Sequence, residues 1–187
     1  GRPLLGKEEK NAVSQVLEGP ILVHGPISEQ FETRFGENTG AAGACSVSSC
    51  TAALHLAFFD IQIGPGDEVL VPSLTHTATV HAVSFTGATP VFIDCDPISG
   101  NMDLEKMRSA ITEHTKAVAV VHFLGVPVDM QVVMEIAREN KLVVVEDCAL
   151  AMGSTISGKH VGLFGDYGCF SFYPVKHLRS EERRVGK

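Results

Sequence analysis

Short apolar runs alternate with segments of helical apolar spacing over most of the chain. Runs of four or five apolar residues between turn residues are typical of buried strands, whereas apolar residues three and four apart are typical of helices. The alternation predicts βαβ units and a parallel sheet covered on both faces, over residues 40 to 176. The predicted strands are 44–48, 68–72, 90–94, 117–121 and 142–146, and the predicted helices between them are 51–61, 80–85, 104–111 and 130–140.

Two further helices are predicted before the first of these strands. The segment from Lys7 to Leu17 has helical apolar spacing, and the glycine and proline that follow it end a helix. Ser28, a residue type that caps helices, is predicted to open a second helix over 28–37. The segment 19–26 between them begins and ends with a Gly-Pro pair and is predicted to be a loop.

Composition narrows the class of protein. Apolar residues make up 44% and charged residues 20% of the 187 residues, which is typical of a globular domain. The formal net charge of −7 argues against a nucleic-acid or anionic-membrane surface, because both need clustered lysine and arginine. The five cysteines have no CxxC spacing, which predicts reduced thiols in a cytoplasmic protein and argues against a zinc site.

Two charged side chains follow predicted strands in the last third of the chain. Asp147 comes directly after the run 142–146, and Lys176 follows a second apolar run, 169–172, which is also predicted to be a strand. Ligands of open α/β sheets bind at the carboxyl ends of strands. A lysine there is a candidate Schiff-base nucleophile, and an aspartate can hold the pyridinium nitrogen of a pyridoxal phosphate enzyme. A solvated loop lysine is the alternative, and it is the commoner case.

Two other junctions follow predicted strands and open predicted helices. A helix beginning near Thr51 would direct free backbone N–H groups and its positive dipole end toward a phosphate at Ser49–Thr51. The alternative is that Ser49 or Thr51 only caps the helix. At Thr75–His76, the imidazole could stack on a flat cofactor ring, or it could belong to an ordinary half-buried histidine. Neither junction has the glycines of a Walker A loop or a dinucleotide fingerprint.

Together these segments resemble the DegT/DnrJ/EryC1/StrS family of sugar aminotransferases, which are pyridoxal 5'-phosphate (PLP) enzymes of fold type I. The resemblance runs from about Gly6 to Leu178, with several motifs in the family's order and spacing. It implies a three-layer α/β/α architecture with a mostly parallel sheet, of which this chain is an N-terminal fragment. The matching stretches read VSSCTAALHLA, GPGDEVLVPSLTHTATVHAV, GATPVFIDCD, EDCALAMGS, GKHVGLFGDYGCFSF and YPVKHL.

The resemblance implies a role for each site residue. Lys176 would be the Schiff-base lysine and would move a proton during transamination, and Asp147 would pair with the pyridine nitrogen of PLP. His76 stands where the family usually has an aromatic side chain over the ring face. The phosphate would be held, partly through backbone N–H groups, by Cys50, Thr51 and Ser171.

Two departures from the family pattern stand out. Leu150 occupies the position where the family commonly has glutamine or histidine near the phenolic oxygen of the cofactor, and leucine can donate no hydrogen bond there. After Leu178 the sequence 179–187 is charged and aperiodic, and it is interpreted as a non-native or disordered tail. The resemblance thus divides the chain into an N-terminal helical segment and loop (1–36), a partial PLP-binding large domain (37–178) and that tail.

The implied function is transamination of a keto-sugar nucleotide with glutamate or glutamine as amino donor. The full-length protein would be a homodimer, and the fragment alone could be inactive. A sugar dehydratase of the same family is one alternative, although such members commonly replace the lysine that stands here as Lys176. Thiol chemistry at Cys50, at the start of a helix, is another, and a non-catalytic scaffold or regulator is the third.

Overall fold

The computed structural model describes residues 6–176, which form two units. The first unit comprises the residues up to Val47 together with the segment that begins at Phe172. The second unit comprises Ser48–Ser171. The division predicted at residues 36 and 178 stays a prediction, and the predicted tail, 179–187, lies outside the described residues.

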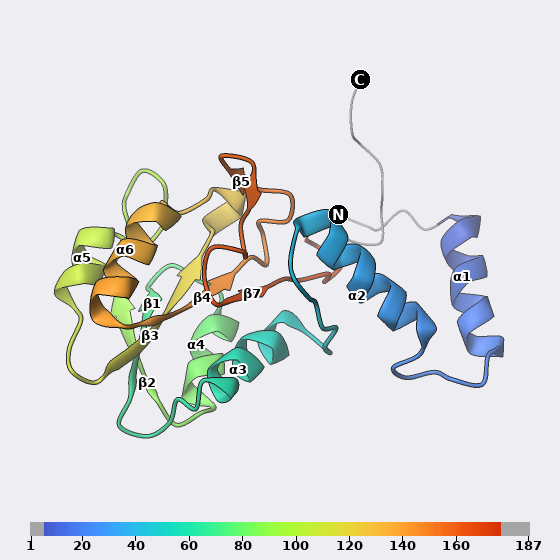
Figure 1. Cartoon of the computed structure of the whole chain (residues 1–187), viewed down its shortest axis with the longest axis horizontal. Helices are drawn as coiled ribbons and strands as arrows, with labels where there is room; N and C mark the ends of the chain where they lie inside the picture. The colour runs from blue at the N-terminus through green and yellow to red at the C-terminus, as the bar shows by residue number, and fades with distance from the viewer. Residues whose placement is uncertain (1–5, 177–187) are drawn as a thin grey trace. The chain divides into compact units, whose positions relative to one another are not determined.

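The second unit contains a five-stranded sheet in which all neighbouring strands are parallel (Figure 1). The strand order is β2-β1-β3-β4-β7. Each connection from β1 through to β4 passes through a helix, because parallel strands need a long crossover. The predicted βαβ units are therefore confirmed. The strands are β1 (Glu68–Pro72), β2 (Thr89–Ile93), β3 (Thr115–Val121), β4 (Val143–Asp147) and β7 (Tyr167–Cys169).

The strand side chains alternate between two apolar cores, one on each face of the sheet. Val69, Val71 and Val145 belong to one core, and Leu70 and Val144 belong to the other; all five are fully buried. Each such side chain stabilises the fold by roughly 1.5–3 kcal/mol relative to an exposed one. This alternation confirms the three-layer α/β/α architecture. The first core includes residues of α3 (Cys50–Asp60) and α4 (Thr77–Ser84), and the second includes residues of α5 (Leu104–Ser109) and α6 (Met130–Asn140).

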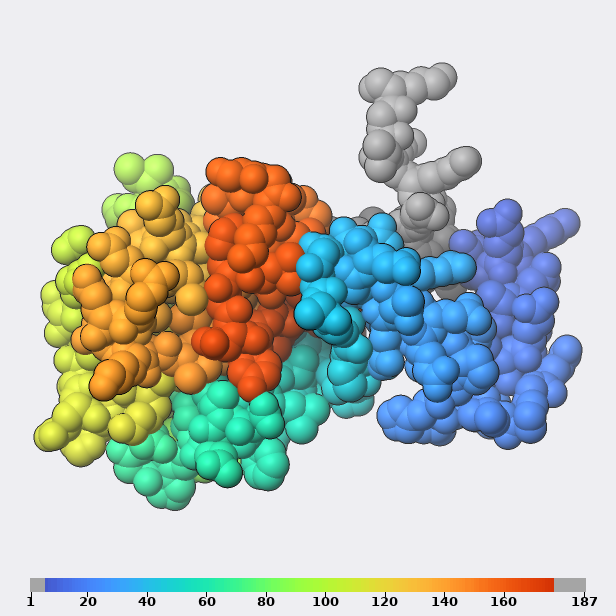
Figure 2. Space-filling view, in the orientation of Figure 1, coloured from blue at the N-terminus to red at the C-terminus, as the bar shows by residue number. Residues whose placement is uncertain are grey.

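In the space-filling view, α6 and the segment after β4 form a continuous surface that covers the sheet of the second unit (Figure 2). The helix α6 begins and ends where the sequence predicts it. The side chain of Asp129 accepts from the backbone N–H groups of Gln131 and Val132, at 3.1 and 3.3 Å, and so caps its start. Lys141, with φ 56°, takes the left-handed conformation that ends the helix.

Two short elements lie beside the strand ends. The 3₁₀ turn η1 (Phe123–Gly125) follows β3, and an antiparallel hairpin of β5 (Thr155–Ile156) and β6 (Lys159–His160) follows β4. The hydroxyl of Ser154 donates to the carbonyl of Gly125 at 2.8 Å, which ties the loop after β3 to the loop after β4.

The first unit contains α1 (Lys7–Glu18) and α2 (Pro26–Thr39), as predicted in number and order. Phe31 and Phe35 of α2 and Phe172 form an aromatic cluster with centroid separations of 5.1–6.0 Å. Both rings of α2 meet Phe172 edge to face, the arrangement that aromatic quadrupoles favour. Among the helices in residues 6–176, none is long and apolar enough to cross a membrane.

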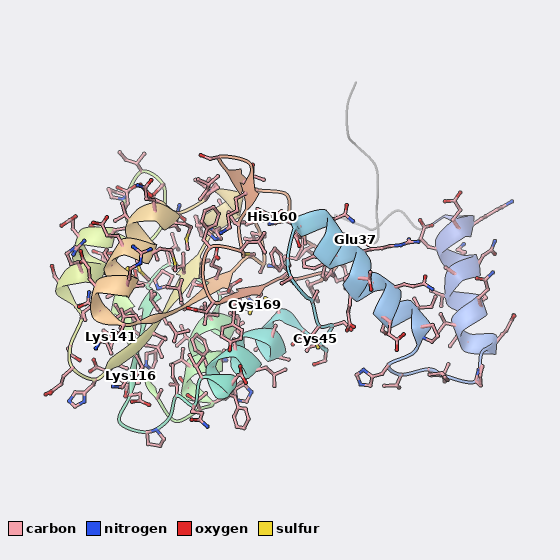
Figure 3. The ribbon with its side chains drawn as sticks, viewed as in Figure 1. Glu37, Cys45, Lys116, Lys141, His160 and Cys169 are labelled. Carbon is pink, nitrogen blue, oxygen red and sulfur yellow. The ribbon has the colours of Figure 1, made fainter. Side chains whose placement is uncertain are left out.

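Several predicted boundaries are wrong; α4, for example, begins at Thr77 rather than near Val80. The helix α2 begins at Pro26 rather than Ser28, because proline suits the first helical position. The predicted strand 44–48 is coil, as the ribbon around the labelled Cys45 shows (Figure 3). There the backbone N–H and hydroxyl of Ser46 both donate to the Glu32 carboxylate, at 2.7 and 2.6 Å, so that N–H is not available to a sheet. The strand predicted at 169–172 is β7, which ends at Cys169.

Candidate cofactor site

Asp147 is the last residue of β4 and lies at the carboxyl end of the parallel sheet. It is only 5% exposed. The hydroxyl of Thr79 donates to Oδ2 at 2.8 Å, the backbone N–H of Ala149 donates to Oδ1 at 3.0 Å, and Sγ of Cys50 lies 3.9 Å from Oδ1. A buried carboxylate is costly unless it accepts hydrogen bonds, and these bonds favour its ionised form.

The Asp147 carboxylate lies beside the first turns of two helices. Cys50 is the first residue of α3, and Thr79 is the third residue of α4. The first turn of a helix carries partial positive charge, and its N–H groups have no acceptor within the helix. Both helix ends therefore stabilise negative charge at Asp147, and this end of the sheet also suits an anionic ligand.

Thr79 is a candidate site residue that the sequence predictions missed. It is fully buried, and its hydroxyl lies 2.8 Å both from Asp147 Oδ2 and from the hydroxyl of Thr75. The spacing of four between the two threonines is visible in the sequence and matches one helical turn, although Thr75 itself lies before α4. The contact between Thr79 and Asp147 joins residues 68 positions apart, and no local pattern indicates it.

The junction at Ser49–Thr51 forms the start of α3. The hydroxyl of Ser49 accepts from the backbone N–H of Ala52 at 3.1 Å, so Ser49 caps the helix. Ser49 is exposed, whereas Cys50 and Thr51 are half-buried. Their predicted contact with a phosphate stays a prediction, and it is compatible with the cap because the cap engages only the N–H of Ala52.

His76 caps α4 through its imidazole. Nδ1 accepts from the backbone N–H of Ala78 at 3.1 Å, which fixes the ring at the helix start. The residue is exposed rather than half-buried. Its ring therefore sits on the same helical turn as Thr79, at the carboxyl end of the sheet. Stacking on a cofactor ring stays a prediction.

Ser171 and Lys176 lie on the segment that follows β7. Ser171 is half-buried and stands two residues after Cys169, the β7 residue that pairs with Asp147 and is labelled in Figure 3. Lys176 belongs to the first unit, where its backbone N–H donates to the carbonyl of Tyr173 at 2.8 Å. The second unit brings Cys50, Thr75 and Asp147 together, while the predicted roles of Ser171 and Lys176 stay predictions.

Leu150 is half-buried in the turn after Asp147. Its carbonyl oxygen lies so close to Gly125 that a Cβ atom there would meet it at 2.8 Å. Gly125 also has φ 84°, so glycine is required at this position for two reasons. The loop after β3 therefore packs directly on the backbone of Leu150.

Glu146 forms a second buried polar cluster, which the sequence predictions also missed. Glu146 and His122 are both fully buried, and Nε2 of His122 lies 3.0 Å from Oε2 of Glu146. Three backbone N–H groups also donate to this carboxylate, at 2.6–2.8 Å: those of Gly162, Phe164 and Gly165. One side chain thus anchors the whole turn that leads into β7.

The hydrogen bonds decide the charge of Glu146. Burial disfavours the ionised form, but the bonds from His122, Gly165 and Gly162 outweigh burial and hold the pKa of Glu146 below its ordinary value. The neighbouring thiols behave differently. Burial raises the pKa of Cys169 to about 12 and that of Cys148 well above its ordinary value, so both are neutral thiols near pH 7.

His122, Glu146 and Cys148 are all buried, and one potential ligand atom from each lies within 4.8 Å of the others. The donor set does not suit a metal ion, because both ring nitrogens of His122 are engaged. Nε2 bonds to Glu146, and Nδ1 accepts from the backbone N–H of Val128 at 3.1 Å. The cluster therefore serves the fold of the strand ends.

The family profile described as DegT/DnrJ/EryC1/StrS aminotransferase family matches residues 3–182. The chain is 42% identical over 182 residues to a GDP-perosamine synthase of Escherichia coli O157:H7, and the match covers 97% of this chain and 50% of that protein. The chain spans about half the length of the curated relatives it matches.

Solved structures agree with this assignment. An aminotransferase from Psychrobacter cryohalolentis superposes with a TM-score of 0.92 at 37% identity, covering 96% of this chain and 46% of that one. The Streptococcus pneumoniae protein Spr1654 in its PLP form superposes with a TM-score of 0.92 at 30% identity, covering 96% and 50%. By the extent of the profile match and the similarity of the fold, the chain belongs to the DegT/DnrJ/EryC1/StrS aminotransferase family.

Proposed function

We propose that this chain is the cofactor-binding part of a PLP-dependent aminotransferase that acts on a keto-sugar nucleotide, with glutamate or glutamine as amino donor. The name of the GDP-perosamine synthase relative supports a sugar substrate, and the PLP form of Spr1654 supports the cofactor. The observation that carries the proposal is the buried carboxylate of Asp147 at the carboxyl end of β4, held beside the first turns of α3 and α4.

The residues present fit PLP chemically. A protonated pyridine nitrogen is a cation with one N–H donor, and a buried, ionised carboxylate is its natural complement. A phosphate is a dianion, and the half-buried start of α3 offers N–H groups, a positive dipole end and the hydroxyls of Ser49 and Thr51.

The bound cofactor would supply an electron sink for the carbon that gains or loses the amino group. Asp147 would keep the pyridine nitrogen protonated, and Lys176 would hold the cofactor and move a proton to and from that carbon. Cys50, Thr51 and Ser171 would hold the phosphate. His76 would cover a face of the ring. We also infer a cytoplasmic homodimer, since cysteines that form no disulfide fit a reducing compartment.

The test is covalent trapping of the cofactor. The chain is incubated with PLP, the visible absorbance band is recorded, and the mixture is reduced with borohydride and mapped by peptide mass spectrometry. We expect one label, on Lys176. Lys141 provides a matched control, because it is an exposed lysine at the end of α6. An equal yield of label on Lys141, or a label that survives in Lys176→Ala, would contradict the proposal.

A second comparison separates this function from thiol chemistry at Cys50. Cys50→Ser keeps a small polar side chain at the first position of α3. If the lysine and Asp147 carry the chemistry, Cys50→Ser should retain the visible band and the borohydride label. Loss of amino transfer in Cys50→Ser with an unchanged band would instead favour the thiol.

A further inference from the structure

We propose that Thr79 is a positioning residue that holds the Asp147 carboxylate ionised and in one orientation, and that the hydroxyl of Thr75 orients Thr79. The inference rests on the proposed function, because Asp147 matters for chemistry only if it meets the cofactor. The structural basis is the pair of 2.8 Å contacts that join Thr75, Thr79 and Asp147 in a line.

The number of hydroxyl protons determines which group donates in each of these two hydrogen bonds. A hydroxyl has one proton, and an ionised carboxylate can only accept. The proton of Thr79 is committed to Oδ2 of Asp147, so Thr75 must be the donor in the contact between the two threonines. Each hydroxyl in such a chain polarises the next, which strengthens the bond to the carboxylate.

Burial makes the Thr79 hydroxyl hard to replace. Thr79 is fully buried and Asp147 is 5% exposed. If the hydroxyl is removed, Oδ2 loses a donor in a region where burial penalises charge. Protonation of Asp147 then becomes easier, and a protonated Asp147 no longer complements a pyridinium.

Among the described residues, the Ala149 N–H donates to the other oxygen, Oδ1, and the thiols and the carboxylate near Asp147 are poor substitutes for the Thr79 donor. Cys50 on α3 offers a thiol, which is a weak donor, at 3.9 Å. Cys169 on β7 and Cys148 after β4 are neutral thiols, whose pKa values burial and the nearby carboxylates raise. Glu146, the adjacent residue on β4, adds negative charge and engages His122 from the loop after β3. Among these groups, Thr79 makes the short side-chain bond to Asp147.

The same two hydrogen bonds link Asp147 to the loop that carries His76. Thr75 precedes His76 directly, and His76 caps the helix whose third residue is Thr79. A change at Thr79 therefore acts on two predicted cofactor contacts, the carboxylate and the imidazole. This is the reason to call Thr79 a positioning residue rather than a residue of the core.

The first experiment uses the chain without cofactor, so that it does not depend on the proposed function. The pKa of Asp147 is measured from its side-chain ¹³C shift in the wild type, Thr79→Val, Thr79→Ser and Thr75→Val. Thr79→Val keeps the shape and removes the donor, and we expect the pKa of Asp147 to rise by about one unit, a tenfold change in ionisation. Thr79→Ser retains the donor and should return the wild-type value.

Thr75→Val keeps the test decisive if Thr79→Val does not fold, because Thr75 is only half-buried and lies before α4. Removal of the Thr75 hydroxyl should raise the pKa of Asp147 by a smaller amount, which corresponds to about a threefold change in the ionisation constant. An unchanged pKa in Thr79→Val, or in Thr75→Val when that is the folded variant, overturns the proposal.

The second experiment is a double-mutant cycle in which the PLP affinity of each variant is measured by equilibrium titration. Thr79→Val should weaken binding about tenfold, Thr79→Ser should restore it, and Thr79→Val should add almost nothing to Asp147→Asn. Additive losses would show that Thr79 acts independently of Asp147 and would overturn the inference. If the wild type binds no PLP, the proposed function fails, and the cofactor-free titration still decides the role of Thr79.

Discussion

Glu146 and Asp147 are adjacent on β4, and their carboxylates serve opposite faces of the sheet. Asp147 meets Cys50 and Thr79 of the α3/α4 layer. Glu146 meets His122 and the backbone of the turn that begins at Gly162. Because successive strand residues point to opposite faces, one acidic pair supplies both a candidate cofactor contact and an anchor for the strand ends.

Replacing Glu146 with glutamine should destabilise the second unit by about 3 kcal/mol, because an amide NH₂ would face N–H donors that the carboxylate now accepts. The free energy of unfolding from urea titration checks this. Glu139→Gln is the matched control, since Glu139 is 50% exposed and pairs with Arg108 on the surface. The control should cost less than about 1 kcal/mol. Equal losses in the two variants would contradict the anchoring role.

The stability of the wild type should fall as the pH is lowered below about 4.5, which is the ordinary pKa of a glutamate such as Glu146. The pKa of Glu146 is lower in the folded state than in the unfolded state, so its contribution is present above the unfolded value and is lost as the pH falls through the folded one. Urea titrations at several pH values between 7 and 3.5 measure this. The difference in stability between wild type and Glu146→Gln should shrink toward low pH; a constant difference would rule the linkage out.

The ring proton of His122 should lie on Nε2 and not on Nδ1. Nδ1 accepts from the N–H of Val128 at 3.1 Å, so it carries no proton, and Nε2 then donates to Glu146 at 3.0 Å. The ¹⁵N shifts of the ring report the tautomer directly, and His114, which is exposed, serves as the internal reference. A protonated Nδ1 would require a different partner for the Val128 N–H and would contradict this assignment.

The sequence predicts those parts of the fold that local chemistry determines. The helix α6 is correct to the residue, because apolar periodicity and the Asp129 cap agree. The strand predicted at 44–48 is wrong, because a carboxylate 14 residues away takes the N–H of Ser46. Contacts between residues distant in sequence also limit what could be predicted of the candidate site. Asp147 stands out as a charge after a strand, whereas the importance of Thr79 depends on a contact across 68 residues.

Gly165 should tolerate no larger side chain. A Cβ atom there would lie 2.6 Å from the carbonyl oxygen of Val144 and 2.9 Å from its side chain, and Val144 is fully buried in β4. The backbone N–H of Gly165 also donates to Glu146 at 2.6 Å, so the turn cannot move away from β4 without losing that bond. Gly165→Ala should therefore cost about 3 kcal/mol or more of unfolding free energy, as overpacked core sites do.

Gly43→Ala is the matched control for this change. A Cβ atom at Gly43 would meet no atom within 4 Å, so the substitution should alter stability by less than about 1 kcal/mol. Because Gly165 lies on the turn that Glu146 anchors, Gly165→Ala and Glu146→Gln should be less than additive when combined. Full additivity in a double-mutant cycle would mean that the close approach of Gly165 to β4 and its bond to Glu146 are separate features, and the anchoring of this turn by Glu146 would have to be abandoned.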